Sequence, residues 1–153
     1  MATSVTLYLP LSTSIVLQSF ANAAWVQRVS IRPEAVISPI TFQGQGYYDT
    51  PIGQTTFTTP ASSPNPKGFA VTVSVDHSRN GGQTWEPSVV DWAPCQVMYY
   101  NLYTVASEDA TNNTWDDCTT YFSWSTAPKA LNETRTHQES QKHSEHQERK
   151  ERA

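Results

Sequence analysis

Positive charge is scarce in this chain outside its last 25 residues. Residues 1–128 hold nine acidic side chains and only four basic ones, a net charge of −5 before histidine is counted. Proteins that bind nucleic acid neutralise its phosphates with clustered lysine and arginine. No basic stripe is present in residues 1–128, so nucleic acid is excluded as an expected partner.

Cysteine and uninterrupted apolar runs are scarce as well. Cys95 and Cys118 form one disulfide only if their strands are neighbours, and two buried free thiols are the preferred interpretation. The run from Leu7 to Ala24 ends like a signal-peptide cleavage site, but Pro10 and polar residues interrupt it and no basic residue precedes it. We therefore expect no membrane span and no signal peptide, and a chain that is cytoplasmic or exported by a leaderless route.

Catalytic motifs are also missing. The sequence has no Gly-x-Ser-x-Gly elbow, no His-Glu-x-x-His pair and no glycine-rich phosphate loop. Ser78–Trp85 resembles the Asp-box hairpin of sialidases, with Asn80 in place of the aspartate, but it occurs once, whereas a propeller needs several blades. His77 beside this hairpin is expected to be a solvated turn residue. We expect a protein that is not an enzyme.

The dominant pattern that is present is alternation with a period of two. Apolar residues alternate with polar or small ones over residues 5–9, 69–75 and 118–124, which is typical of half-buried strands. Further β-like runs, separated by turn residues such as Gly44-Gln45-Gly46, cover residues 15–20, 25–31, 36–42, 55–59, 89–92 and 96–105. The sequence therefore predicts an all-β domain, an antiparallel sandwich or barrel of eight or nine strands.

A change of composition near Pro128 divides the chain. Between residues 129 and 153 only Ala130, Leu131 and Ala153 are apolar. Such a segment cannot bury enough surface to offset the entropy lost on ordering. We expect one domain over residues 1–128 and a disordered or solvated helical tail over residues 129–153.

The densest group of oxygen-bearing side chains precedes the last alternating run. Four carboxylates and two side-chain amides fall within the ten residues 108–117. Hard cations such as calcium are held by these oxygens, although acidic and Asn-rich segments also form solvated turns without a metal. The EF-hand pattern is absent, so any calcium here would be bound by another fold.

Several segments together resemble the calcium-mediated lectins related to the bacterial fucose- and mannose-binding lectin, of which this chain would be a divergent member. They are Leu9-Pro10, Phe20-Ala21-Asn22, Phe42-Gln43-Gly44-Gln45 and the loop Glu108–Asp117 before a strand ending at Trp124. Spacings match along residues 3–127, apart from a longer region at 76–94. The resemblance implies a Greek-key β-sandwich of about nine strands, usually dimeric, in which adjacent calcium ions bind sugar hydroxyls directly.

Site residues are carried over from the resemblance by position. The implied metal ligands are Asn22, Glu108, Asn112, Thr114, Asp116 and Asp117. The implied sugar-binding residues are Asn22, Ala23, Ala24, Glu108, Asp109 and Asp117. Asp109 would accept a hydrogen bond from a sugar hydroxyl. Ala23 has no hydroxyl to bond the sugar, and by the resemblance alanine at this position leans toward mannose over fucose. Trp25 either stacks on a sugar face or is the first inward residue of the next strand.

The loop departs from the family's acidic pattern. Asn112 and Thr114 stand where relatives have ligand aspartates, and Asp116 stands where they have an asparagine, so the site loses one negative charge. The neutral hydroxyl of Thr114 screens two divalent cations poorly. We therefore expect a lectin for mannose- or fucose-containing glycans that binds one or two calcium ions weakly. The alternative is a lectin-fold interaction or structural module without calcium-dependent sugar binding.

Overall fold

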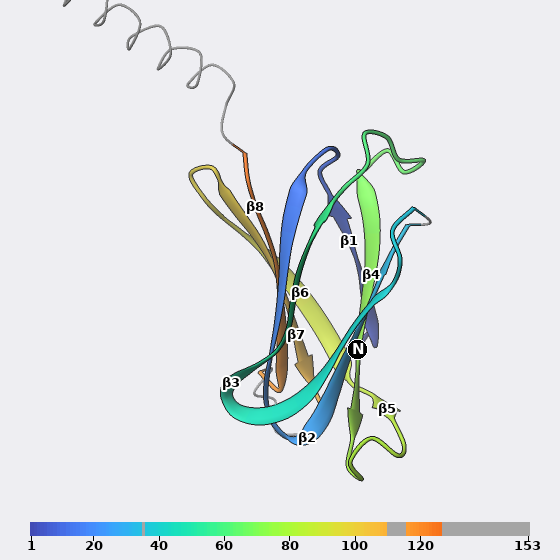
Figure 1. Ribbon diagram of the computed structural model, residues 1–153, viewed down its shortest axis with the longest axis vertical. Helices are drawn as coiled ribbons and strands as arrows, with labels where there is room; N and C mark the ends of the chain where they lie inside the picture. Colours follow the sequence, from blue (N-terminus) through green and yellow to red (C-terminus); the bar gives the residue numbers. More distant parts are fainter. Residues whose placement is uncertain (35, 110–115, 127–153) are drawn as a thin grey trace, which may run out of the picture.

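The computed structural model describes residues 1–34, 36–109 and 116–126, and the regular structure of this part is entirely β (Figure 1). The described strands are β1 (Ser4–Leu9), β2 (Ser14–Pro33), β3 (Ile40–Thr58), β4 (Phe69–Ser78), β5 (Glu86–Pro87), β6 (Val89–Val97), β7 (Tyr100–Glu108) and β8 (Cys118–Ser125). The prediction of an all-β fold is confirmed. Within the described residues, no helix has the length and apolar character needed to cross a bilayer.

The long strand β2 joins two halves of one antiparallel sheet. The strands follow the order β1-β4-β2-β8-β7-β6, with β3 also paired to β2 and β5 to β4. Residues 16–21 of β2 pair with β8, whereas residues 26–33 pair with β4. β3 runs beside β2 along both segments, so the β2–β3 hairpin belongs to both halves. Figure 1 shows β1 and β4 on one side of the molecule and β6, β7 and β8 on the other.

The hydrophobic core lies between these halves. Its members come from both of them and include Leu7 and Leu9 of β1, Phe69, Val71, Val73 and Val75 of β4, Val105 of β7, and Phe122 and Trp124 of β8. The alternation that the sequence shows over residues 69–75 is also the alternation of burial along β4. Tyr103 of β7 donates a hydrogen bond from its hydroxyl to the Tyr8 carbonyl at 3.2 Å, which links the two halves.

The middle of β2 is irregular. Its register with β3 shifts between Ser19 and Phe20, between Ala21 and Ala23, and between Ala23 and Gln27. Such bulges bend a strand and increase its twist. Across from them, Gly46 has a φ of 152°, and a side chain there would collide with Thr50. The bend therefore places residues 22–25 where the two halves of the sheet meet.

The described residues form eight strands, whereas the sequence shows nine β-like runs. The runs 15–20 and 25–31 are both parts of β2. The runs 36–42 and 55–59 overlap the two ends of the single strand β3, which begins only at Ile40, and the short β5 is additional. The turn expected at Gly44-Gln45-Gly46 is therefore wrong. These glycines lie inside β3, where a side chain at Gly44 would strike Ile52.

Two side-chain predictions also need correction. Cys95 and Cys118 are both free, but only Cys118 is buried, because Cys95 lies on β6, an outer strand exposed from Asp91 onward. His77 is not a solvated turn residue. It lies in β4 with 3% of its surface exposed, and its Nδ1 forms a 2.9 Å hydrogen bond with the Ser88 hydroxyl.

Candidate functional site

The acidic loop leaves and re-enters the sheet beside the bend of β2. β7 ends at Glu108, β8 begins at Cys118, and β8 pairs with the first half of β2 up to Ala21. The Asn22 backbone N–H donates to the Asp117 carbonyl at 2.9 Å, and the Asp117 N–H donates to the Ser107 carbonyl at 3.2 Å. Three strands therefore fix the position of Asp117.

Glu108, Asp109 and Asp117 gather their carboxylates at this point. One oxygen from each lies within 4.8 Å of the others. Glu108 and Asp117 are buried, with 4% and 6% of their surfaces exposed. The Asp109 N–H donates to Asp117 Oδ2 at 2.8 Å.

The charge state of Asp117 reflects this crowding. Burial raises the pKa of Asp117 to about 7; the Asp109 N–H opposes the shift, and the Asp109 and Glu108 side chains add to it. Three acidic groups so close together repel each other unless a proton or a cation lies among them. A cluster of buried carboxylate oxygens fits the donor chemistry of calcium.

Asn22 and Asp116 extend the oxygen cluster toward β3. Asn22 donates from Nδ2 to Asp116 Oδ2 at 3.0 Å, and its Oδ1 accepts a hydrogen bond from the Tyr48 N–H at 2.9 Å. The fold thus brings Asn22, Asp116 and the carboxylate cluster to one end of β8. The other two implied ligands, Asn112 and Thr114, lie outside the described residues. Among the implied sugar contacts, Ala23 is buried and Ala24 is exposed.

Gln27 is a neighbour of the site that the sequence interpretation missed. Its side chain is completely buried, and its Nε2 donates to Asp109 Oδ2 at 2.7 Å and to the Trp25 carbonyl at 3.2 Å. Gln27 therefore fixes one oxygen of the carboxylate expected to meet the sugar. The available signal was a polar residue in register with Val29 and Ile31 on the inward face of a strand.

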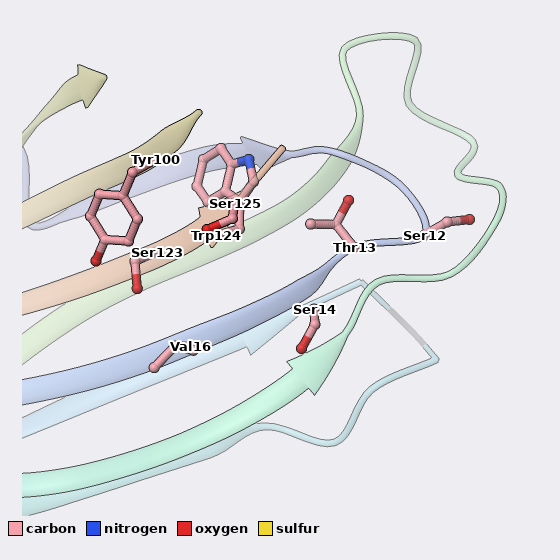
Figure 2. A pocket seen from close by; sticks show the side chains of 8 residues that line it. All are labelled: Ser12, Thr13, Ser14, Val16, Tyr100, Ser123, Trp124 and Ser125. Carbon is pink, nitrogen blue, oxygen red and sulfur yellow. The ribbon is translucent and has the colours of Figure 1, made fainter. Parts of the chain in front are cut away.

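A separate pocket of about 430 Å³ lies near the other end of β8. Figure 2 shows its lining of mainly hydroxyl and aromatic side chains: Ser12, Thr13, Ser14, Val16, Tyr100, Ser123, Trp124 and Ser125. It shares no residue with the carboxylate cluster, and we assign it no function.

Comparisons with solved structures find bacterial lectins with a similar fold. A high-affinity mannose-binding lectin of Ralstonia solanacearum is similar with a TM-score of 0.60 and 25% identity, over 80% of this chain and 96% of that one. A Chromobacterium violaceum lectin solved with α-methyl-fucoside has a TM-score of 0.60 and 22% identity, again over 80% of this chain and 96% of that one. The C-terminal domain of a Burkholderia cenocepacia lectin has a TM-score of 0.59 and 20% identity, with the same coverage of both chains.

Of two sequence comparisons, one found no match and the other found a family. The comparison with curated proteins gave no match. The family profile of fucose-binding lectin II (PA-IIL) matches residues 7–126, which include every described strand from β2 to β8 and the whole carboxylate cluster. The chain belongs to the fucose-binding lectin II (PA-IIL) family.

Proposed function

We propose that this protein is a calcium-dependent lectin that binds a mannose-type or fucose-type monosaccharide at the bend of β2, and that it is not an enzyme. The observation that supports this most is the convergence of the Glu108, Asp109 and Asp117 carboxylates within 4.8 Å, in a chain of a sugar-binding lectin family. Calcium accepts six to eight oxygen ligands, so a site that leaves places open can take two neighbouring hydroxyls of a sugar.

The proposed metal ligands come from three segments. Glu108, Asp116 and Asp117 supply carboxylate oxygens, and Asn22 supplies its side-chain oxygen from the bend of β2. The proposal includes Asn112 and Thr114 by resemblance only, since they lie outside the described residues. Two of the carboxylates, Glu108 and Asp117, are buried, and burial disfavours their ionised form. A bound cation would stabilise the ionised form. We propose one or two ions, bound more weakly than by relatives with a more acidic loop.

The proposed sugar contacts surround the same oxygens. Asp109 accepts a hydrogen bond from one sugar hydroxyl. The other sugar hydroxyls lie next to three proposed metal ligands: Asn22, Glu108 and Asp117. Ala23 and Ala24 follow Asn22 directly and offer no hydroxyl, and by resemblance alanine at position 23 favours mannose over fucose. Relatives bound to or named for both sugars are consistent with either ligand.

A glycan array probed with calcium and again with chelator tests the proposal. Binding to mannose- or fucose-terminated glycans that chelator abolishes is the expected result. Asp117→Ala should abolish the same signal, because it removes a carboxylate at the centre of the cluster, whereas Asp91→Ala on the exposed edge of β6 should not. Binding that is unaffected by chelator or by Asp117→Ala contradicts the proposal.

A lectin-fold module without calcium-dependent sugar binding is the second candidate. The loss of charge at Asn112 and Thr114 favours it, because less negative charge is left in this loop to stabilise divalent ions. Metal analysis of the purified protein separates the candidates, since this module would hold no calcium. We propose a homodimer as the assembly, and light scattering after gel filtration measures it.

A further inference from the structure

The Gln27 amide group connects the proposed sugar site with a tryptophan. Asp109 Oδ2 and the Trp25 carbonyl both lie within 3.2 Å of Gln27 Nε2, so Trp25 sits next to the carboxylate proposed to meet the sugar. Trp25 is half-buried in β2, directly after Ala23 and Ala24. The Trp25 indole stacks on His77, and His77 pairs with Gln27 between β4 and β2, so the indole lies on the same side of the sheet as the Gln27 amide group.

The Trp25 ring supports an exposed arginine. The His77 imidazole stacks on the indole with ring centroids 5.4 Å apart and an angle of 20° between the planes. The Arg79 guanidinium lies 4.4 Å from the centroid of the indole ring. Its side chain is 58% exposed, so the guanidinium can still donate hydrogen bonds to a ligand. Glu86 lies 3.6 Å from it and balances its charge.

The loop that carries Arg79 is held in place by its own side chains. The Ser78 hydroxyl accepts a hydrogen bond from the Gly82 N–H at 2.8 Å. Asn80 Oδ1 accepts from the Thr84 N–H at 2.9 Å, and Asn80 Nδ2 donates to the Thr84 hydroxyl at 2.8 Å. An arginine on a fixed loop loses less conformational entropy on binding than one on a mobile loop.

A second contact fastens the far side of the same loop to β2. The Arg28 guanidinium lies 4.0 Å from the centroid of the Trp85 ring and pairs with Asp76 at 2.8 Å. The Ser78–Trp85 loop is thus attached to β2 at Trp25 and at Arg28, on either side of Gln27.

We propose that Trp25 and Arg79 form a second sugar subsite, which takes the neighbouring unit of an oligosaccharide whose first unit is bound at the calcium-dependent site. The ligand unit is a neutral hexose, because Glu86 already compensates the arginine charge and sugar hydroxyls accept hydrogen bonds from a guanidinium. The indole keeps the guanidinium in position, and the guanidinium donates the hydrogen bonds to the sugar hydroxyls. This inference rests on the proposed function.

The test compares one sugar unit with two. Calorimetric titrations with calcium measure the dissociation constants of methyl α-mannoside and of each α-linked mannobiose, for the wild type, Trp25→Ala, Arg79→Gln and the control Arg32→Gln. In the wild type and the control, at least one mannobiose should bind about tenfold more tightly than the monosaccharide. In Trp25→Ala and Arg79→Gln this advantage should fall to about twofold or less.

The possible failures are distinguishable. If methyl α-mannoside binds and no mannobiose gains affinity, the subsite is refuted while the proposed function stands. The same holds if the advantage survives in Arg79→Gln, an exposed substitution that leaves the core untouched. If neither methyl α-mannoside nor methyl α-fucoside binds with calcium, the proposed function and the subsite both fall.

Discussion

Replacing Gln27 by Met tests whether a buried amide prepares Asp109 for its ligand. Gln27 is fully buried, and its 2.7 Å hydrogen bond to Asp109 Oδ2 joins a neutral donor to a carboxylate. Hydrogen bonds to charged groups contribute about 1.5–3 kcal/mol. If about 1.4 kcal/mol of that energy orients Asp109 for the sugar, Gln27→Met should weaken sugar binding about tenfold.

The same substitution should have little effect on folding. Met fills nearly the volume of Gln, and among the described residues none gives a hydrogen bond to the buried Gln27 Oε1. An unsatisfied buried polar atom costs about 1–3 kcal/mol, so its removal offsets the loss of the two bonds from Nε2. We expect the free energy of unfolding to change by about 1 kcal/mol or less.

Calorimetric titration of the calcium-saturated protein with methyl α-mannoside and methyl α-fucoside measures the effect. Gln18→Met is the matched control, because Gln18 lies on the same strand and donates only a long 3.4 Å bond to Gln54 at an exposed position. Sugar affinity in Gln27→Met within about twofold of the wild type refutes the reasoning. An equal loss in Gln18→Met does so too.

Three further predictions concern the metal loop and the core. Thr114→Asp should strengthen calcium binding about tenfold by adding a carboxylate, and calorimetry with calcium alone would show no gain if Thr114 is not a ligand. Without calcium, the pKa of Asp117 is about 7 in the folded chain against an ordinary value of 3.8, so the folded state holds the proton more tightly. Stability should therefore fall as pH rises through this interval, and thermal unfolding in chelator at about pH 5 and about pH 8 should show a smaller fall for Asp117→Asn; equal falls would contradict the assignment. Phe122→Ala should lower the free energy of unfolding by about 3–5 kcal/mol in denaturant titrations, because Phe122 is fully buried between the two halves of the sheet, and a loss below about 1 kcal/mol would argue against that core.

Local sequence patterns predicted the strands in which every second residue is buried. The alternation over Phe69–Val75 and Cys118–Trp124 reports directly which face is buried, and both segments are strands. The continuity of β2 was missed because bulges at Phe20, Ala23 and Gln27 use ordinary residues that carry no turn signal. A strand that bends looks like two strands in the sequence.

The candidate site also has a part that the sequence predicts and a part that it does not. The oxygen-rich loop is visible in the sequence alone, but Asn22 is 94 residues from Asp116, and only the resemblance connected them before the structure did. Gln27 and His77 were missed or misplaced because a buried polar residue depends on partners from distant segments, such as Asp109 and Ser88. No local pattern contains that information.

The bend of β2 constrains how this lectin can change its ligand. Residues 22–27 lie between two segments whose inward faces are already set, one against β8 and one against β4. Inserting or deleting one residue there without a compensating change in the bulges would turn every side chain of one segment to the opposite face. Variants with new sugar preferences should therefore arise by substitution at constant length in this segment, while changes of length accumulate in the hairpin that follows β4.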